Sequence, residues 1–353
     1  MRCYQRVVAC AAAFTARGRD ASPSADCLRL APHDRSAPGP NVTASTSVLA
    51  VGGEGVVELR SGEVMARFVP AAGMLGVSLN RGGEEFLAMP GSIDGFRGGH
   101  TTGLPILHPW ANRLSSRRFA VAGTEVDLTD VELHTDQLGL PIHGTLAGDA
   151  GWEIMRAAAD DVDGTAQLLA RFSYDRPDLL AAFPFPHDLV VEATVSIDGL
   201  SVHATISPTG GISVPVSLGW HPYLRLPDTA RSEWLLGLPD RSHLALDDRG
   251  LPTGDSRPES AELAPIAGRG FDDLYALGDD RRLVLEDGRR RLVVELEEGY
   301  PYGQVYVPAD SDFACLEPMT APTNALVTGD CPIVAPGELF AAAFSIRIES
   351  LAG

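Results

Sequence analysis

The sequence predicts an all-β protein, and three observations support this prediction. Short segments rich in β-branched and aromatic residues recur from about residue 47 to the end of the chain. Glycine and proline, with 37 and 26 residues, separate these segments at short intervals. Three Asp-Gly pairs, at 163, 198 and 287, lie between such segments and are strong hairpin signals. Helical periodicity is nearly absent, so we expect a large sandwich or barrel whose site is built by long loops.

The first predicted strands span 56–60 and 64–69, with a turn at Gly62-Glu63. The Asp-Gly pairs are predicted to join 152–156 to 166–174, 189–197 to 200–207, and 282–286 to 290–297. In the second of these hairpins every other residue from 189 to 197 is apolar, which indicates one buried face. Residues 178–183 are expected to form a turn or two of helix at most.

The N-terminal part of the chain differs from the rest. Residues 1–47 are rich in Ala, Arg, Pro and Ser and have no sustained period. We expect a disordered tail or an over-long start here, followed by a single β-domain over 48–353. Arg2 and Arg6 precede an apolar run at 7–14, which is at the short edge for a signal peptide. A cytoplasmic protein is therefore expected, and export directed by residues 1–16 is the lesser alternative.

Composition excludes several classes of function. The 353 residues carry a formal net charge of -19, which repels nucleic acid and anionic membranes, so neither is an expected partner. No apolar run reaches the roughly 18 residues of a membrane span. The chain has no lysine, which excludes Schiff-base chemistry and a phosphate-loop lysine. The cysteines form no C-x-x-C pair, which argues against a structural zinc site and fits a reducing cytoplasm.

A carboxylate before a proline marks the stretch C-L-E-P-M-T-A-P-T-N-A-L at 315–326. Glu317 precedes Pro318, which disfavours helical geometry, and Pro318 with Pro322 argues against a central strand. We therefore expect Glu317 at the end of a strand, on a stiff and partly buried loop. A carboxylate held in this way is suited to act as a general base. On this stretch alone, a structural carboxylate that bonds its own loop is the commoner case.

Two histidines also lie on loops shaped by proline or glycine. His221 stands in G-W-H-P-Y at 219–223, locked before Pro222 and flanked by aromatic residues. We favour a functional role for His221, because a surface histidine rarely has such neighbours. His143 precedes Gly144 in P-I-H-G, and on this pattern alone a loop histidine bonded to the backbone is the favoured explanation.

Two further stretches combine aromatic and polar residues. Trp110, Asn112 and Arg113 follow two prolines and could form a platform for a polyol, with donors for hydroxyls and a ring for C–H groups. A buried tryptophan beside an arginine paired with a surface acid is the alternative. Asp272 and Asp273 stand between aromatic residues, where one of them is available to a ligand; a turn acid is the commoner case.

The residues alone leave several chemistries open. A metal centre of His143, His221 and an acid lacks the short ligand spacing that marks such sites. A serine triad lacks its G-x-S-x-G turn. A glycosidase pair of Glu317 with Asp272 or Asp273 stays possible.

In this order, the stretches resemble the aldose 1-epimerase (galactose mutarotase-like) family. The resemblance covers about residue 48 to the C-terminus and rests on P-W-A-N-R at 109–113, H-G at 143–144, H-P-Y at 221–223 and E-P-M-T-A-P-T-N-A at 317–325. It implies a large antiparallel β-supersandwich and an isomerase that interconverts the anomers of a free hexose or related aldose. It implies a small sugar as substrate, no cofactor, no metal, and a monomer or homodimer.

The resemblance also implies roles for individual residues. Glu317 would be the general base and His221 the general acid that protonates the ring oxygen, while His143 would hold the ring oxygen or a nearby hydroxyl. The expected sugar contacts are Arg113, Asn112, Asp272, Asp273, Trp110 and Tyr223, with Asp272 preferred to Asp273. Leu224 replaces the aromatic residue that the family usually has after H-P-Y, which leaves the identity of the sugar open.

Three alternatives remain beside this function. They are a non-catalytic sugar-binding protein of the same fold, a sugar-phosphate epimerase and a glycoside-cleaving enzyme. A pure binder has no need for both Glu317 and His221. A phosphate-sugar enzyme should show clustered basic residues, and Arg117 and Arg118 near Arg113 are not a persuasive cluster.

Overall fold

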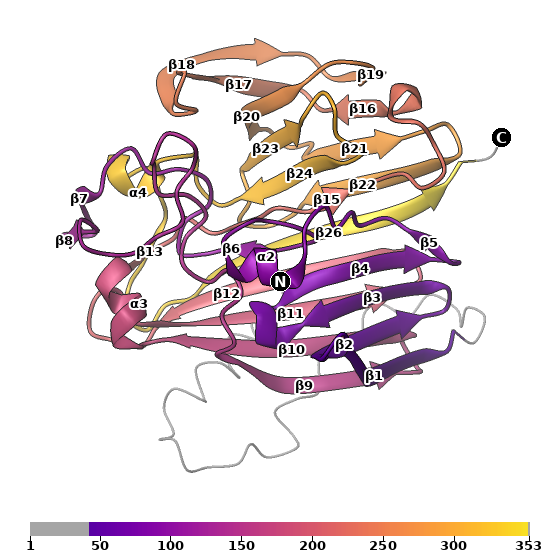
Figure 1. Cartoon of the computed structure of the whole chain (residues 1–353), viewed down its shortest axis with the longest axis horizontal. Helices are drawn as coiled ribbons and strands as arrows, with labels where there is room; N and C mark the ends of the chain where they lie inside the picture. Colours follow the sequence, from indigo (N-terminus) through magenta and orange to yellow (C-terminus); the bar gives the residue numbers. More distant parts are fainter. Residues whose placement is uncertain (1–41, 352–353) are drawn as a thin grey trace.

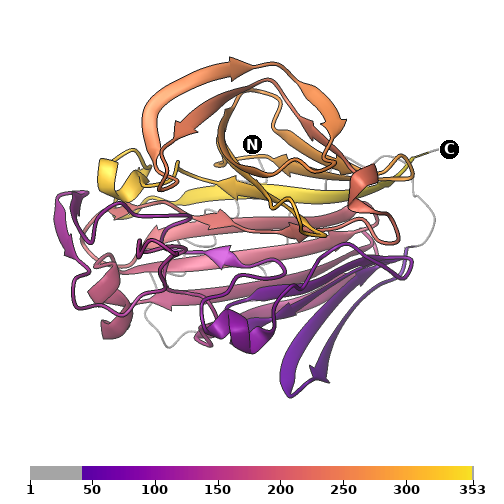
Figure 2. The same ribbon diagram turned by 45° about the horizontal axis from the view of Figure 1, so that its top comes forward.

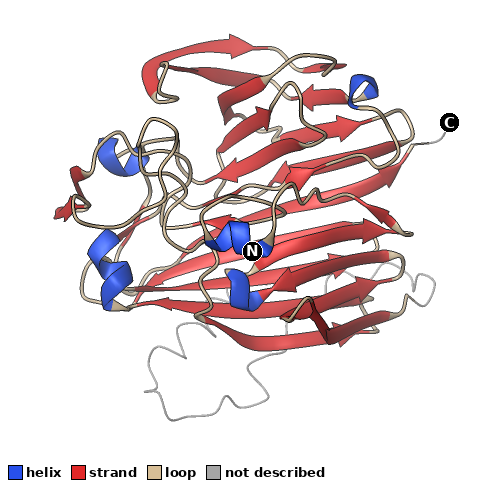
Figure 3. Cartoon of the chain, in the orientation of Figure 1, coloured by secondary structure: helices blue, strands red, loops and turns tan. Residues whose placement is uncertain are grey.

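The computed structural model of the chain describes residues 42–351, and its regular structure is almost entirely antiparallel β-sheet (Figure 1, Figure 3). The predicted fold class is confirmed. The largest sheet has nine strands, in the order β19 (Glu262–Pro265), β16 (Leu235–Leu238), β21 (Arg282–Glu286), β22 (Arg290–Leu296), β26 (Phe340–Ser350), β12 (Gly199–Pro208), β11 (His187–Ser196), β10 (Thr165–Tyr174) and β9 (Trp152–Asp160).

An eight-stranded sheet carries the candidate site. Its order is β18 (Pro252–Glu259), β17 (Arg241–Leu246), β20 (Phe271–Leu277), β23 (Tyr302–Val307), β24 (Ala314–Met319), β14 (Gly219–Trp220) and β6 (Ile106–Leu107), and β15 (Tyr223–Leu224) also pairs with β24. A five-stranded sheet follows chain order: β1 (Ala44–Val51), β2 (Glu54–Ser61), β3 (Val64–Val69), β4 (Leu75–Arg81) and β5 (Glu84–Glu85).

The remaining elements are short. Two-stranded sheets pair β13 (Val214–Pro215) with β25 (Ile333–Val334), and β7 (Arg118–Val121) with β8 (Thr124–Asp127). The helical turns are η2 (Pro70–Ala72), α2 (Ile93–Arg97), α3 (Pro177–Ala182), η3 (Arg231–Glu233) and α4 (Ala325–Thr328). No helix within residues 42–351 has both the length and the apolar character needed to cross a membrane.

The hairpins follow the sequence pattern. All three predicted Asp-Gly hairpins form, as β9–β10, β11–β12 and β21–β22. In β11 the apolar residues Leu189, Val191, Ala193 and Val195 are fully buried. Ile197 is 49% exposed because it lies in the turn after the strand. The predicted buried face therefore ends at Val195 and not at Ile197.

One hydrophobic core joins the three large sheets. It contains buried residues of β2 and β3 from the five-stranded sheet, β10–β12, β22 and β26 from the nine-stranded sheet, and β23 and β24 from the eight-stranded sheet. The eight-stranded sheet curls away at its β17–β18 edge, which forms the orange arch at the top of Figure 2. In β24, Ala314 and Leu316 belong to this core, while Cys315 and Met319 pack on the opposite face. Glu317 shares that opposite face, since side chains alternate along a strand.

The N-terminal boundary differs slightly from the prediction. β1 begins at Ala44, so the sheet includes residues before the predicted domain start at residue 48. The rest of the predicted tail, including the possible signal peptide, lies outside the described residues.

Candidate active site

Strand pairing places Glu317 between two polar neighbours. On one side, β23 pairs with β24 so that Gln304 lies directly opposite Glu317. On the other side, β14 and β15 pair with β24 in one continuous register, which puts His221 opposite Glu317 in the gap between these two short strands. Directly opposite residues on one face of an antiparallel pair have Cβ atoms about 5 Å apart. The backbone alone therefore brings Gln304, Glu317 and His221 into a row.

Glu317 lies inside a strand, so the expectation of a loop at a strand end is wrong. β24 runs through Glu317 and Pro318 and has partners on both sides. Thr320 donates its backbone N–H to Leu218 on the side of β14. Alternate residues of a strand direct their N–H groups to the same side. Pro318 has no N–H, so the donor that β24 lacks would lie on the side of β14, where the partner strand is interrupted at His221. The interruption makes a proline compatible with the middle of a sheet.

His221 and Glu317 form the closest titratable pair of the site. His221 Nε2 lies 3.4 Å from Glu317 Oε1. Both residues are buried, with exposed fractions of 5% and 2%. His143 meets the ring of His221 edge to face, with centroids 5.6 Å apart. Tyr223 stacks on a face of the His221 ring, with centroids 4.7 Å apart and planes 12° from parallel.

Two irregular loops bring His143 to this pair. His143 donates its backbone N–H to the carbonyl of Asn112, and both residues have left-handed backbone conformations, with φ of 64° and 57°. Gly144 has φ of +74°, and a Cβ added there would lie 2.1 Å from the carbonyl oxygen of His108. Glycine is therefore required where the two loops cross. The close crossing sets the position of His143.

Arg113 is held by neighbours on both sides. Its Nε donates to Asp136 Oδ2 over 2.8 Å, and its Nη1 donates to Asn112 Oδ1 over 3.1 Å. Its carbonyl accepts from the backbone N–H of Asn324, in the loop that follows β24. The guanidinium also acts on the site, because it partly opposes the rise that burial causes in the pKa of Glu317. The loop of Arg113 and the stretch of Glu317 therefore meet in space.

Asp272 and Gln304 extend the cluster to the solvent. Gln304 Nε2 donates to Asp272 Oδ1 over 2.7 Å. Gln304 is only 1% exposed, whereas Asp272 is partly buried and reaches the solvent. Gln304 stands in the plain strand sequence Y-G-Q-V-Y-V and carries no motif that marks it as functional. Its one signal was a polar residue in a strand that is otherwise buried.

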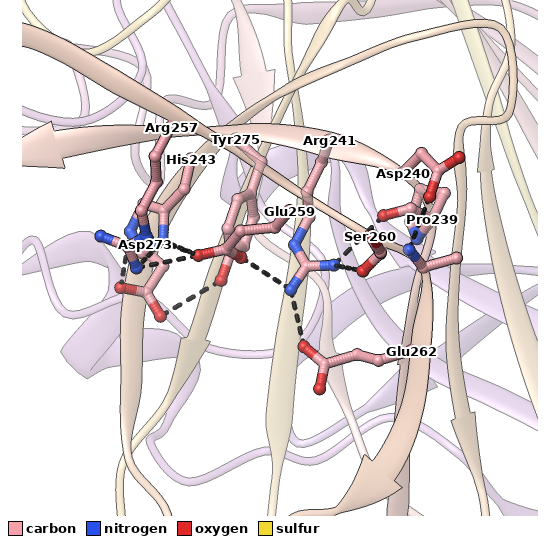
Figure 4. A network of polar contacts seen from close by, with 11 residues as sticks. Pro239, Asp240, Arg241, His243, Arg257, Glu259, Ser260, Glu262, Asp273 and Tyr275 are labelled. Carbon is pink, nitrogen blue, oxygen red and sulfur yellow. Dashed lines mark hydrogen bonds and ion pairs between the residues drawn. The ribbon is translucent and has the colours of Figure 1, made fainter.

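Asp273 lies on the other face of β20 and belongs to a different network (Figure 4). Its Oδ1 lies 3.3 Å from His243 Nε2, and its Oδ2 accepts from the hydroxyl of Tyr275 over 3.3 Å. The same network contains Arg241, which pairs with two glutamates, and it lines an open pocket of about 500 Å³. Of the two adjacent acids, only Asp272 joins Glu317.

Two predicted sugar contacts are buried. Trp110 has no exposed surface and belongs to the main hydrophobic core, so its ring does not form the platform that the sequence suggested. Tyr223 is 5% exposed, and its hydroxyl is hydrogen-bonded to Thr101 Oγ1 at 2.7 Å. Leu224, where the family usually has an aromatic residue, is also fully buried and packs in the core.

Burial moves the proton affinities of the central pair in opposite directions. Burial raises the pKa of Glu317 well above its ordinary value; the negative charge of Asp272 raises it further, and Arg113 partly opposes both. Burial lowers the pKa of His221 to about 3. The pair therefore holds one proton between its two members over a wide range of pH. The two groups titrate together, so the position of that proton, on the carboxyl or on the imidazole, is set by the pair and not by either residue alone.

Burial also acts on the outer residues of the cluster. It lowers the pKa of His143 well below the ordinary range, and the neighbouring His221 and Arg113 lower it further. Partial burial raises the pKa of Asp272, while Arg113 and the hydrogen bond from Gln304 oppose this rise. His143 is thus neutral at physiological pH and can accept or donate one hydrogen bond.

Within residues 42–351, no group of three or more His, Cys, Asp or Glu side chains is arranged to hold a metal ion. The metal centre considered for His143, His221 and an acid is therefore not formed by these residues.

The sequence and fold match one family. A model of the aldose 1-epimerase family matches residues 56–347. The chain belongs to the aldose 1-epimerase family. All residues of the cluster around Glu317 fall within the span that matches this family, from Arg113 to Glu317 itself.

Solved structures of low sequence identity share the aldose 1-epimerase fold. A galactose mutarotase-like protein from Clostridium acetobutylicum superposes with a TM-score of 0.77 at 19% identity, covering 88% of this chain and 99% of that one. Galactose 1-epimerase from Lactobacillus acidophilus superposes with a TM-score of 0.71 at 14% identity, covering 88% and 100%. The uncharacterized protein YihR of Escherichia coli (strain K12) is 28% identical over 232 residues, 64% of this chain and 71% of YihR.

Proposed function

We propose that the protein is an aldose 1-epimerase that interconverts the α and β anomers of a free hexose or related aldose. The observation that carries this proposal is the 3.4 Å approach of His221 Nε2 to Glu317 Oε1. Anomer exchange needs one proton removed from the anomeric hydroxyl and one delivered to the ring oxygen. A base and an acid that meet at one point can perform both transfers.

The reaction then follows from the arrangement of the pair. With the shared proton on His221, the carboxylate of Glu317 takes the proton of the anomeric hydroxyl while the imidazolium gives its proton to the ring oxygen. The C1–O5 bond breaks and leaves an open-chain aldehyde. Rotation about the C1–C2 bond presents the other face of the carbonyl to the C5 hydroxyl. Ring closure returns both protons, so the site ends in its starting state and consumes no co-reactant.

The surrounding polar groups support binding of a hydroxyl-rich ligand. Among the described residues, the buried side-chain atoms without a hydrogen-bond partner include Nδ1 of His143 and Oε1 of Gln304. A buried polar group without a partner is costly, so such atoms mark hydrogen-bonding capacity. Arg113 and Asp272 add a donor and an acceptor nearer the rim. This mixture suits the alternating hydroxyls of a sugar.

The contacts of the basic residues that follow Arg113 in the sequence favour a free sugar over a sugar phosphate. Arg117 donates to the backbone carbonyls of Leu128 and Val131. Arg118 pairs with Asp127, and its side chain is 71% exposed. Neither guanidinium is free to form, together with Arg113, the cluster that a phosphate would need.

The test is the rate of anomer exchange. Polarimetry or NMR on freshly dissolved α-glucose, α-galactose and a panel of sugars and sugar phosphates should show exchange faster than in buffer. Glu317→Gln and His221→Asn should each lower kcat by about 10²–10⁴-fold. Matched controls are Glu286→Gln, at a buried glutamate of the nine-stranded sheet, and His203→Asn, at an exposed histidine. Full activity in the first two variants would remove the proposed roles.

Other results would select another function. Sugar binding in a calorimeter without exchange above the buffer rate would indicate a binding protein. Release of reducing ends from oligosaccharides would indicate a glycoside-cleaving enzyme.

A further inference from the structure

Tyr223 makes a contact with His221 that differs from every other ring contact of that histidine. Its ring lies 4.7 Å from the imidazole, with planes 12° from parallel. His143 and Tyr306 meet the same imidazole edge to face, at 84° and 73°. Among the described residues, Tyr223 alone covers a flat face of His221 with an aromatic ring.

Tyr223 is itself held in place from several directions. Its hydroxyl is hydrogen-bonded to Thr101 Oγ1 at 2.7 Å, and its backbone pairs with Cys315 in β24. The ring of Phe313 packs against it at 4.8 Å. Thr101 also lines, with His143, a small cavity of about 10 Å³. The tyrosine therefore links the loop near His143 to the strand of Glu317.

These contacts leave little of Tyr223 for a sugar. One ring face lies on His221, Phe313 packs against the ring, and the hydroxyl is already bonded to Thr101. The residue is 5% exposed. Burial also raises the pKa of the hydroxyl, so it stays neutral and takes no part in proton transfer. A role as a substrate contact, which the sequence suggested, fits this geometry poorly.

The stacked ring answers a physical difficulty of the proposed mechanism. A general acid must carry a proton, yet burial opposes the charged form of His221. The groups that face the imidazole are Glu317, His143, Tyr223 and Tyr306. Of these, the carboxylate of Glu317 and the electron-rich face of Tyr223 favour the imidazolium. His143 is neutral, and Tyr306 is farther away, with its ring plane 73° from that of the imidazole.

We propose that Tyr223 is a positioning residue for His221. Its ring fixes the imidazole plane so that Nε2 points at Glu317 and stabilises the protonated form, and its hydrogen bond to Thr101 fixes the ring. This inference deepens the proposed function, and its kinetic test rests on that function, whereas its spectroscopic test does not.

Variants at position 223 separate the ring from its hydroxyl. Tyr223→Phe keeps the stacked ring and removes the bond to Thr101, as does Thr101→Val from the other side. Tyr223→Met removes the ring at similar volume. Tyr275→Phe is a control at a buried tyrosine of the other face of the sheet. We expect kcat to fall at least about tenfold in Tyr223→Met with KM unchanged, and less than threefold in Tyr223→Phe. The effects of Tyr223→Phe and Thr101→Val on kcat should not add in the double variant, because both remove the same hydrogen bond.

The independent readout is the ¹⁵N chemical shift of the His221 ring at neutral pH, assigned with His221→Asn. It reports how much of the shared proton resides on the imidazole, with or without enzymatic activity. The imidazolium share should fall in Tyr223→Met and stay unchanged in Tyr223→Phe and Tyr275→Phe. If Tyr223→Met does not fold, trifluorophenylalanine compared with phenylalanine at position 223 weakens the ring face without changing its shape, and should lower the same share.

The opposite pattern would overturn the proposal. An unchanged ¹⁵N shift in Tyr223→Met or the fluorinated variant would show that the ring does not favour the imidazolium. A rise in KM with kcat unchanged would return Tyr223 to the substrate contacts. If no variant and no wild-type protein exchanges anomers while the ¹⁵N shift responds as expected, the proposed function fails and the positioning role stands.

Discussion

Two adjacent acids with different surroundings show how a single residue acquires its role. Asp272 and Asp273 are chemically identical and neighbours in sequence. Strand geometry directs them to opposite faces of β20, where Asp272 bonds Gln304 and Asp273 meets His243. The sequence narrowed the candidates to this pair but could not separate them with certainty, because the parity of a strand is fixed only by its pairing in three dimensions.

The pair of acids provides a matched test of the electrostatics at Glu317. Burial raises the pKa of Glu317, and the charge of Asp272 raises it further. In Asp272→Asn this influence is lost while the oxygen that accepts from Gln304 remains, so the pKa of Glu317 should fall. The alkaline limb of the kcat–pH profile should then move to lower pH. Asp273→Asn should leave that limb in place, and equal shifts in both variants would contradict the assignment of Asp272 to the site.

The pH profile of the wild-type protein follows from the shared proton of His221 and Glu317. In the proposed reaction the pair is active with one proton; it gains a second only as pH falls toward 3 and loses its last proton above the ordinary range of a carboxyl. An exposed Glu–His pair would be active only between their reference pKa values of about 4.3 and 6.5. We expect a plateau wider than this at both ends. The profile is measured by anomer exchange, with circular dichroism at each pH to confirm that the fold persists; a narrow bell between the reference values would contradict the burial argument.

At the scale of elements, the sequence predicted hairpins well and long-range neighbours poorly. The Asp-Gly hairpins depend on turns only a few residues long, so local patterns identify them. The pairing of β24 with the interrupted β14–β15 joins residues about a hundred positions apart. Pro318 consequently looked incompatible with a central strand, and Gln304 carried no motif. What was missing was the register, which no local pattern contains.

The crossing of two loops at Gly144 gives a prediction at this scale. A side chain there would face both a positive φ and a Cβ placed 2.1 Å from the carbonyl oxygen of His108. In Gly144→Ala we expect the free energy of unfolding to fall by about 1–3 kcal/mol or more. The rate of anomer exchange should also fall, because the adjacent His143 would shift. Gly211→Ala is the matched control, at a glycine with open space and no positive φ. Denaturant midpoints and exchange rates measure both effects; equal behaviour of the two variants would show that the loop crossing does not position His143.

At the scale of the whole molecule, the candidate site rests on the core between the sheets. Trp220 directly precedes His221 and is fully buried, and its indole N–H donates to the hydroxyl of Tyr300. Phe344 of β26 packs against both rings, with centroids 5.6 and 6.0 Å away. The long strand of the nine-stranded sheet therefore supports the strand end that carries His221. The sequence could predict that these residues are buried, but not that they lie beneath the site.

This connection predicts that a core substitution affects both stability and activity. Phe344→Ala removes a fully buried ring and should cost about 3–5 kcal/mol of unfolding free energy. Because the cavity would lie against Trp220, the folded variant should also show slower anomer exchange at temperatures well below its unfolding transition. Ile197→Ala, at a half-exposed hairpin tip on the same sheet, should change neither property appreciably. Guanidinium titrations and exchange rates at low temperature test the two effects separately. A Phe344→Ala protein that is destabilised but fully active would show that the site does not depend on the packing beneath it, and that strand register alone holds His221 against Glu317.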